Sequence, residues 1–458
     1  PEGLKEIGAR TFNGMTQLVE IKISSTVEII GDEAFAGLRE NADEKNKMQL
    51  SNIDFSEATA LREIGYKSFI YTDYLATIDL STCISLEKIG KEAFSYAKVL
   101  QTLILPANLK IIGEGAFKSL AKDVSSMQLD LSTVTSLEEI GNEAFINAKI
   151  TSVKFPASLK IIGDRAFFWH SKDSILRSVD FSLAVSLEEI GNEAFSFVPI
   201  EGTLDLTPMT NLVRIGTKAF WRCNLLTGIS FPNNDVLTEI GDKAFAGYDN
   251  GSSAAGYMDI RIVDLRPLTN LKKIGKWTFA FNVNLEEVYF PVGLEEIGRG
   301  AFTRCAPPAY SEEGEYTLNP LTQLNIPYTV KTIGEEAFCT NMHGYYSLLE
   351  KVYIGDAVNG SMLEYVNHRA FGSCNNLKEV YIYATMPPKS TTQSPQWKIF
   401  SRGDVTSVAV GNYDIVDLKI YVPKGALQNY LNAEIYTDSV NMWAKDHTSQ
   451  LVEMEDSD

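Results

Sequence analysis

The sequence predicts an α/β-type repeat solenoid with short parallel strands and few regular helices. Fourteen variants of the motif I-G-x-x-A-F recur along 458 residues, mostly at intervals of 22 to 28 residues between motif glycines, with longer intervals of 33 to 36. Alternating apolar residues, the pattern of a half-buried strand, precede these copies. A repeat of this length buries its apolar face only against its neighbours, so the array is expected to form one elongated core.

The motif phenylalanines mark the repeats in order. They are Phe12, Phe35, Phe69, Phe94, Phe117, Phe145, Phe167, Phe195, Phe220, Phe245, Phe279, Phe302, Phe338 and Phe371. Glycine lies four residues before each of them, except that Asn367 takes its place in the last copy. Because a small residue precedes each phenylalanine, we expect close packing between coils and a continuous stack of rings.

The first part of a unit, such as Leu100 to Leu105, reads L-x-x-L-x-L and predicts a strand. In several units proline follows and ends the strand, because it lacks the N–H that a ladder requires. These prolines are Pro106, Pro156, Pro232, Pro291 and Pro327. Other units replace proline with a serine or threonine segment, as in Leu129 to Ser132.

The second part of a unit reads L-x-x-I-G-x-x-A-F. Its leucine, isoleucine and phenylalanine are predicted core residues. Its glycine lies at the bend, where we expect a positive φ.

After Ile382 the rhythm breaks, and residues 384–412 are rich in Pro, Ser, Thr and Gly. A final strand is predicted from Val416 to Pro423, followed by a short helix from Gly425 to Leu431, with Trp443 near the end. This segment must cover the last coil of the array. We therefore divide the chain into a solenoid, residues 1–383, and an irregular segment with a C-terminal cap, residues 384–458.

The repeat resembles the BspA-like branch of the leucine-rich repeat proteins of bacterial surfaces, whose units read L-x-x-I-x-I-P-x-x-L-x-x-I-G-x-x-A-F-x-x-C/N. Units from Leu18 to Leu377 carry this pattern. The resemblance implies a curved, right-handed array of about fourteen repeats whose longer strands stack into one parallel sheet with a concave outer face. It also implies a secreted or cell-surface bacterial protein, whose relatives engage host proteins, extracellular matrix or other cells.

Composition excludes several classes of function. The formal charge of −18, from 41 basic and 59 acidic residues, opposes binding to nucleic acid or to an anionic membrane surface. No stretch approaches the roughly 20 apolar residues of a membrane-spanning helix. The first residues already lie inside a repeat, so we expect the natural protein to continue upstream, where a secretion signal or anchor would lie.

Neither catalysis, a cofactor nor a metal site is predicted. No G-x-S-x-G, phosphate loop, H-E-x-x-H or C-x-x-C occurs, and His368 and Cys374 occupy ordinary repeat positions. Five cysteines leave at least one without an intrachain disulfide partner. Cys223, Cys305 and Cys374 lie three residues after a motif phenylalanine, where other units have asparagine, so we interpret them as structural thiols.

The outward positions of the longer strands supply the first candidate binding surface: Tyr289, Asn325, Tyr353 and Tyr381. Tyrosine offers apolar area together with a hydrogen-bonding tip, which suits recognition of a protein or glycan. The preceding outward positions are rich in aspartate, and paired aspartates could hold a hard cation, although no loop has the spacing of a dedicated site. Both rows could equally be solvent-facing residues that only stabilise the sheet.

A second candidate patch lies two residues after the motif phenylalanine: Tyr71, Tyr96, Trp169, Phe197 and Phe281. Exposed aromatic rings there could stack on sugars, or they could cover the core beneath inserted loops. Such loops are predicted at residues 39–47, 247–256, 304–319 and 340–347, and insertions in solenoids often border the binding surface.

These observations predict a non-catalytic binding module that mediates protein–protein interaction or adhesion at the cell surface, with a host or cell-surface protein as partner. Two alternatives remain open. A glycan-binding accessory protein would depend on the second patch, and a structural stalk for an upstream domain would bind through neither surface.

Overall fold

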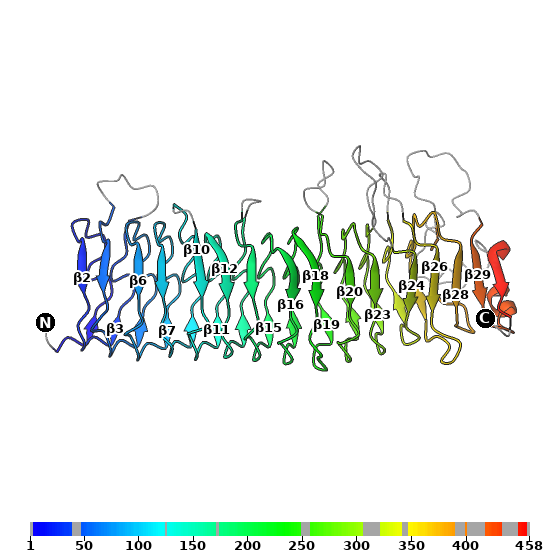
Figure 1. Cartoon of the computed structure of the whole chain (residues 1–458), viewed down its shortest axis with the longest axis horizontal. Coiled ribbons are helices and arrows are strands. Elements are labelled where there is room, and N and C mark those ends of the chain that lie inside the picture. The colour runs from blue at the N-terminus through cyan, green and yellow to red at the C-terminus, as the bar shows by residue number, and fades with distance from the viewer. Residues whose placement is uncertain are drawn as a thin grey trace. The chain divides into compact units, whose positions relative to one another are not determined.

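The structure, a computed structural model, describes residues 3–38, 47–123, 126–170, 174–248, 257–305, 321–340, 347–389, 399–400, 417–432 and 448–455. Two compact units make up the chain, Pro1–Cys223 and Asn224–Asp458. Within each unit the chain winds in successive coils, and two rows of strands run across these coils (Figure 1).

Two-residue strands form a parallel ladder in each unit, and each strand ends directly before the motif glycine or its replacement, Asn367. In the first unit they are β1 (Glu6–Ile7), β3 (Ile29–Ile30), β5 (Glu63–Ile64), β7 (Lys88–Ile89), β9 (Ile111–Ile112), β11 (Glu139–Ile140), β13 (Ile161–Ile162), β15 (Glu189–Ile190) and β17 (Arg214–Ile215). In the second unit they are β19 (Glu239–Ile240), β21 (Lys273–Ile274), β23 (Glu296–Ile297), β25 (Thr332–Ile333) and β27 (Tyr365–Val366).

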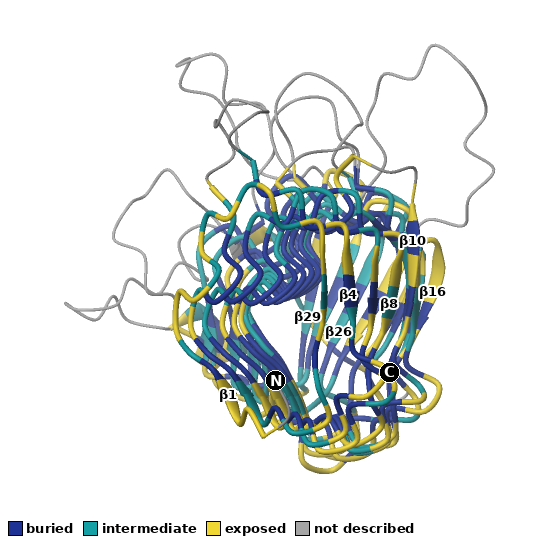
Figure 2. Cartoon of the chain, turned by 90° about the vertical axis from the view of Figure 1, so that its left-hand side faces the viewer, coloured by how far each residue is buried: buried dark blue, intermediate teal, exposed yellow. Residues whose placement is uncertain are grey.

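The longer strands form the other row. In the first unit they are β2 (Glu20–Lys22), β4 (Asn52–Asp54), β6 (Thr77–Asp79), β8 (Thr102–Ile104), β10 (Met127–Asp130), β12 (Ile150–Lys154), β14 (Ser178–Asp180) and β16 (Gly202–Asp205). In the second unit they are β18 (Leu226–Ser230), β20 (Ile262–Asp264), β22 (Glu287–Tyr289), β24 (Gln323–Ile326), β26 (Lys351–Ile354), β28 (Glu379–Ile382), β29 (Lys419–Val422) and β30 (Leu451–Glu453). Figure 2 shows β1 on one side of the coils and β4 and β8 on another.

The expectation that the longer strands form one continuous sheet is wrong among the described residues. They form separate parallel ladders, namely β2-β4, β6-β8 and β10-β12-β14 in the first unit, and β20-β22 and β24-β26-β28-β29-β30 in the second. The uninterrupted ladders are those of the two-residue strands. Every coil has the same length from the motif isoleucine, or valine in the last copy, to the phenylalanine, whereas the connections to and from the longer strands vary in length, and the register of β10 shifts between Met127 and Gln128.

A third side of each coil is also hydrogen-bonded to its neighbour. The Glu33 amide donates to the carbonyl of Tyr66 in the next coil at 2.8 Å. In the same way, Phe35 donates to Ser68 at 2.7 Å and Gly37 donates to Ile70 at 2.8 Å. The same pattern recurs along both units. Backbone polar groups on three sides are therefore satisfied between coils, which permits the apolar side chains to fill the interior.

Stacked phenylalanine rings fill that interior, as the sequence predicts. In the first unit, neighbouring motif rings from Phe12 to Phe220 lie with centroids 5.0–5.6 Å apart and planes within 13°. In the second unit the stack runs from Phe245 to Phe371. It then continues to Phe400, at 5.5 Å from Phe371, in a segment without a motif copy.

The motif glycines do not have the positive φ that we expected. The residue two positions after glycine has it instead, as at Glu33 (52°), Lys67 (53°) and Glu92 (54°). Glycine is required for space, because a Cβ on Gly90 would lie 2.6 Å from the carbonyl oxygen of Ile64 in the preceding coil.

Near the C-terminus, the predicted strand is found as β29 and the predicted helix as α1 (Leu427–Leu431), which is the single α-helix of the described residues. A 3₁₀ turn, Thr448–Gln450, precedes β30. The buried Tyr430 of α1 donates a hydrogen bond to the carbonyl of Ala384, 2.9 Å away. Trp443 and most residues of the four predicted loops lie outside the described residues.

Candidate functional site

Three tyrosines stack on the outer face of the five-stranded ladder of the second unit, and we name them the tyrosine ladder: Tyr353 on β26, Tyr381 on β28 and Tyr421 on β29. They are partners in register along parallel strands. Their ring centroids are 4.7 Å apart between Tyr353 and Tyr381, and 4.5 Å apart between Tyr381 and Tyr421. Sequence reasoning missed Tyr421, although K-I-Y-V at 419–422 repeats the K-V-Y-I and E-V-Y-I of the two preceding strands.

The other two residues of the first candidate surface are placed differently. Asn325 on β24 is the register partner of Tyr353 and therefore extends the ladder by one polar side chain. Tyr289 lies on β22, whose described ladder partner is β20. Its ring is covered by the Arg266 guanidinium at 4.1 Å, and its hydroxyl donates to Glu287 at 2.7 Å. We therefore exclude Tyr289 from the tyrosine ladder.

A charged row accompanies the tyrosine ladder. Lys351 and Glu379, each two residues before a ladder tyrosine, form an ion pair at 2.7 Å. The Tyr381 hydroxyl donates to Glu379 at 3.3 Å, and burial together with that carboxylate raises the pKa of Tyr381. Among the described residues, no hydrogen-bond acceptor contacts the hydroxyls of Tyr353 and Tyr421.

Stacking determines which part of each ring a ligand could contact. Both faces of Tyr381 are covered by Tyr353 and Tyr421, and the three side chains are half-buried. The stack leaves the ring edges, the hydroxyl groups and the outer faces of its two end rings without a tyrosine against them. Edges and hydroxyls suit the peptide groups and side chains of a protein, whereas a sugar stacks on the open face of an aromatic ring.

The aspartate-rich outward positions close turns. Six aspartates there accept a hydrogen bond from the backbone amide two residues later, at 2.8–3.1 Å: Asp54, Asp79, Asp130, Asp180, Asp205 and Asp264. In each unit with proline at that later position, the aspartate is absent. Proline has no backbone N–H to donate, so no aspartate side chain is needed there as a hydrogen-bond acceptor. These carboxylates have a structural role in the turn.

No cation site emerges from the described part of the chain. It contains no group of three or more histidine, cysteine, aspartate or glutamate side chains placed to hold a metal ion.

The residues of the second candidate patch have different partners. Tyr71 and Tyr96 stack on each other with centroids 4.9 Å apart. Phe197 packs edge-on against Phe168 and Trp221, and Arg222 covers one of its faces at 4.7 Å.

The last two residues of that patch have different surroundings. Arg304 covers a face of Phe281 at 5.2 Å. Trp169 is half-buried, and its amide donates to the carbonyl of Ser196 in the next coil at 3.3 Å. This arrangement favours the interpretation that the aromatic residues pack against neighbouring coils.

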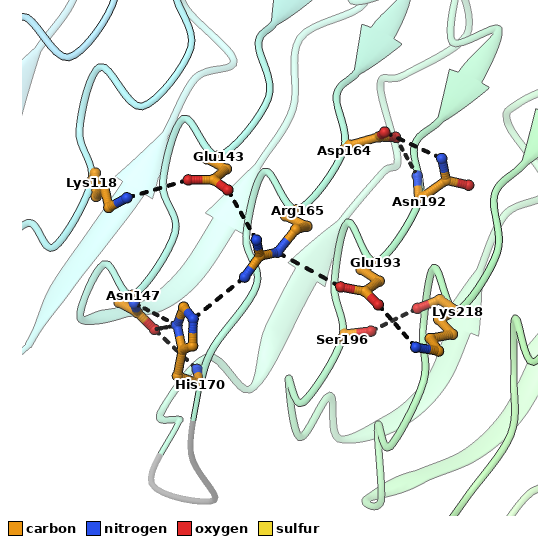
Figure 3. Close-up of polar contacts among 10 residues, drawn as sticks. All are labelled: Lys118, Glu143, Asn147, Asp164, Arg165, His170, Asn192, Glu193, Ser196 and Lys218. Atoms are coloured by element: carbon orange, nitrogen blue, oxygen red, sulfur yellow. Dashed lines mark hydrogen bonds and ion pairs between the residues drawn. The ribbon is translucent and has the colours of Figure 1, made fainter.

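Beside this patch, charged side chains form a chain of ion pairs across coils (Figure 3). Glu143 contacts Lys118 at 3.3 Å and Arg165 at 3.0 Å. Glu193 contacts Arg165 at 3.6 Å and Lys218 at 3.1 Å. Each of these side chains therefore contacts an opposite charge of a neighbouring coil, and exposed pairs of this kind contribute little to stability one by one.

Charge alternates from coil to coil along the whole first unit. Three residues before the motif glycine, successive coils carry Lys5, Glu28, Arg62, Glu87, Lys110, Glu138, Lys160, Glu188 and Val213. Two residues after it they carry Arg10, Glu33, Lys67, Glu92, Gly115, Glu143, Arg165, Glu193 and Lys218. Both columns have the same sign in the same coil wherever both are charged, and contacts such as Lys5–Glu28 (2.7 Å) and Arg10–Glu33 (2.8 Å) join neighbouring coils. The electrostatic period is therefore two coils.

The cysteines of the repeat have a structural function. The Sγ atoms of Cys223 and Cys374 donate to the carbonyls of Phe195 and Phe338 in the preceding coil, at 3.3 and 3.4 Å. In the same position, the Asn282 amide donates to the carbonyl of Phe245 at 3.1 Å. This shared role as a donor explains why the position carries cysteine or asparagine.

Protonation also favours a structural role for these groups. Burial raises the pKa of Cys374 to about 12, so its thiol is not a nucleophile at neutral pH. Burial, followed by the charges of Arg369 and Arg299, lowers the pKa of His368 to about 4. His368 is therefore neutral at pH 7.

In the described residues, no helix is long and apolar enough to cross a bilayer.

Comparison with known families identifies the repeat. The model described as "BspA type Leucine rich repeat region" matches in six copies, over residues 1–43, 45–172, 138–254, 211–309 and 312–386. A comparison with curated proteins finds no match.

Among solved structures, a leucine-rich repeat protein from Bacteroides ovatus is similar at 20% identity and a TM-score of 0.49, covering 95% of this chain and 92% of that one. The pneumococcal vaccine antigen PcpA is similar at 18% identity and a TM-score of 0.35, covering 99% and 85%. A leucine-rich cell surface protein from Faecalibacterium prausnitzii is similar at 17% identity and a TM-score of 0.29, covering 82% of each chain.

Proposed function

Because this chain belongs to the BspA-type leucine-rich repeat family, we propose that it is a non-catalytic binding module that recognises a protein through the tyrosine ladder. The observation that carries the proposal is the stack of Tyr353, Tyr381 and Tyr421 on adjacent, hydrogen-bonded strands. The stack holds the rings in one arrangement before binding, so little side-chain entropy is lost when a partner docks. Tyrosine is also enriched among residues that dominate binding energy at protein interfaces.

The chemistry of the ladder favours a protein over a glycan as its partner. Both faces of Tyr381 and one face each of Tyr353 and Tyr421 are covered within the stack, while two hydroxyls and a Lys351–Glu379 ion pair border the ring edges. Such a surface complements mixed apolar and polar side chains. We place the protein at the bacterial cell surface or outside the cell, as the resemblance to surface repeat proteins implies.

Two further features of this module stay predictions. One is the division into a solenoid, residues 1–383, and a cap, residues 384–458. The other is the right-handed winding and concave outer face of the leucine-rich repeat class.

A binding screen against arrays of extracellular matrix proteins and glycans tests the proposal. We expect the purified chain to retain a matrix protein, and the Tyr353→Ala/Tyr381→Ala variant to lose it. Tyr71→Ala/Tyr96→Ala is the matched control, because it removes another stacked pair with nearly the same ring separation. Thermal unfolding of each variant establishes that it remains folded.

Two outcomes would contradict the proposal. Retention on a polysaccharide that is lost in Trp169→Ala/Phe197→Ala would identify a glycan-binding accessory protein. If no matrix protein or glycan is retained by the folded chain, the structural stalk becomes the better description.

A further inference from the structure

The connection that follows Tyr353 is longer than its counterparts. Residues 355–362 lie between Ile354 and the next core residue, Leu363, whereas residues 327–329 make the same connection in the preceding coil. Sequence reasoning missed this insertion, since it does not follow a motif phenylalanine. Its signal is the pair Gly355 and Gly360 around an Asp and an Asn.

This connection is held together by its own hydrogen bonds. The amide of Asp356 donates to the carbonyl of Gly360 at 3.0 Å, and the amide of Gly360 donates back at 2.9 Å. The Asp356 carboxylate accepts the amides of Val358 and Asn359 at 2.9 and 2.7 Å. The turn therefore has one defined conformation.

Glycine is required at the start of the turn. Gly355 has φ of 90°, and a Cβ there would lie 2.1 Å from the carbonyl oxygen of Gly360. This close approach determines how the tip leaves β26.

The tip of the turn is apolar. Val358 is 91% exposed, and Met362 at the end of the connection is 52% exposed. A valine displayed in this way gains nothing from the fold, and its position in a rigid turn lowers the entropy lost when a partner covers it.

The turn borders the tyrosine ladder. It begins two residues after Tyr353, and the Cβ position of Gly360 lies 3.5 Å from the carbonyl oxygen of Tyr383, two residues after Tyr381. The valine tip and the tyrosine edges therefore lie at the same end of β26 and β28.

We propose that the turn Asp356–Gly360 is an anchor that inserts Val358 into an apolar pocket of a folded protein partner while the tyrosine ladder contacts the surface beside that pocket. This inference rests on the proposed function and adds the kind of partner it requires. A branched aliphatic side chain releases free energy only when another surface removes it from water, and polar sugars do not offer such a pocket. The adjoining Asp356 disfavours an anionic membrane as the occupant.

The experiment measures affinity of the full chain for the matrix protein retained in the screen. Val358→Ala removes two methyl groups from the proposed pocket and is expected to weaken binding roughly tenfold. Val292→Ala is the matched control, because Val292 is a 70% exposed valine in a corner of another coil of the same unit. Neither substitution removes a buried contact, so both variants are expected to unfold at the wild-type temperature.

A second readout reports insertion itself. Val358→Cys labelled with acrylodan should shift its emission to shorter wavelength when the matrix protein binds, and Val292→Cys labelled in the same way should not. Selective labelling is favoured because burial raises the pKa of Cys83, Cys305 and Cys374 to about 12; Cys305 is half-buried, so the wild-type chain treated with acrylodan is the blank.

The outcomes separate the anchor from the binding module. If Tyr353→Ala/Tyr381→Ala loses binding while Val358→Ala binds like wild type and its probe does not shift, the anchor is refuted and the tyrosine surface stands. If neither set of variants alters binding, the proposed function fails, and the anchor fails with it.

Discussion

Gly90 shows how a single residue sets the distance between coils. A Cβ there would lie 2.6 Å from the Ile64 carbonyl oxygen and 2.7 Å from the Gly65 carbonyl carbon, both backbone atoms of the preceding coil. Backbone atoms cannot rotate away as a flexible side chain can. The coils would have to separate to admit a methyl group, at the expense of the hydrogen bonds between them.

Gly90→Ala is accordingly expected to lower the free energy of unfolding by about 1–3 kcal/mol. Gly8→Ala is the matched control at the same motif position, since its Cβ would meet only the Thr11 hydroxyl at 3.5 Å. Urea unfolding followed by circular dichroism measures both. Equal losses in the two variants would show that glycine matters for backbone conformation and not for space.

A second residue-scale prediction concerns the turn aspartates. The hydroxyl and amide of Ser132 donate to Asp130 and lower the pKa of its carboxyl. Asp130→Ala should destabilise the protein by about 1 kcal/mol at pH 7, because the Ser132 amide loses its acceptor. Asp130→Ala/Ser132→Pro should recover much of that loss, since proline removes the unpaired N–H in the way that other coils do.

The pH dependence has a definite sign. A carboxyl whose pKa is lower in the folded state stabilises the protein above its unfolded pKa, and this stability disappears as the pH falls through the folded value. Wild type and Asp130→Ala should therefore differ at pH 7 and converge below about pH 4. Denaturant midpoints across that range provide the measurement, and a constant difference would exclude the charged hydrogen bond as the cause.

Among the elements of the fold, the phenylalanine stack is the part that sequence predicts best. Phe117 is fully buried between Phe94 and Phe145, with ring separations of 5.6 and 5.2 Å. Phe117→Ala should lower the free energy of unfolding by about 3–5 kcal/mol. Phe12 is half-buried, so Phe12→Ala should lower the free energy of unfolding clearly less. Calorimetric unfolding of the two variants tests this order, and equal costs would mean that exposure of the ring does not determine its contribution.

Regular spacing makes such elements predictable. A period in the sequence reports which side chains return to the same place in successive coils, so the family, the coils and the ring stack follow from it. The hydrogen bonds between coils are harder to predict from the sequence than the positions of the side chains. The two residues before each glycine, such as Lys88–Ile89, resemble a bend in sequence and yet form the uninterrupted ladder.

Departures from the period explain what was missed at the candidate site. Tyr421 shares the column of Tyr353 and Tyr381, but a long segment without a repeat separates it from them in the sequence, and Val358 lies in an insertion that shares no column with other repeats. Tyr289, in contrast, was predicted as part of the binding surface and does not belong to the tyrosine ladder. It shares the column of Tyr353, but it is held by Arg266 and Glu287 on another ladder.

At the scale of the first unit as a whole, alternating charge predicts how the array responds to shortening. Thr77 and Thr102 are register partners, so deleting residues 77–101 removes one coil without shifting the strands. Arg62 would then face Lys110. Deleting residues 77–127 removes two coils, and Arg62 would face Glu138 instead.

Raising the salt concentration should therefore stabilise the one-coil deletion relative to the two-coil deletion, because salt screens repulsion in the first and attraction in the second. Denaturant midpoints at low and high sodium chloride measure this difference. A salt response that is the same for both chains would show that the alternation has no energetic effect.

The two-coil period also bears on how a gene for such an array can change its length. A duplication or loss of two coils keeps opposite charges facing each other in the two alternating columns of the first unit, whereas a change of one coil places like charges side by side until later substitutions reverse one of them. Descendants of one ancestral array should thus differ mostly by even numbers of coils. Where they differ by one, a reversed charge beside the altered coil would record such a substitution.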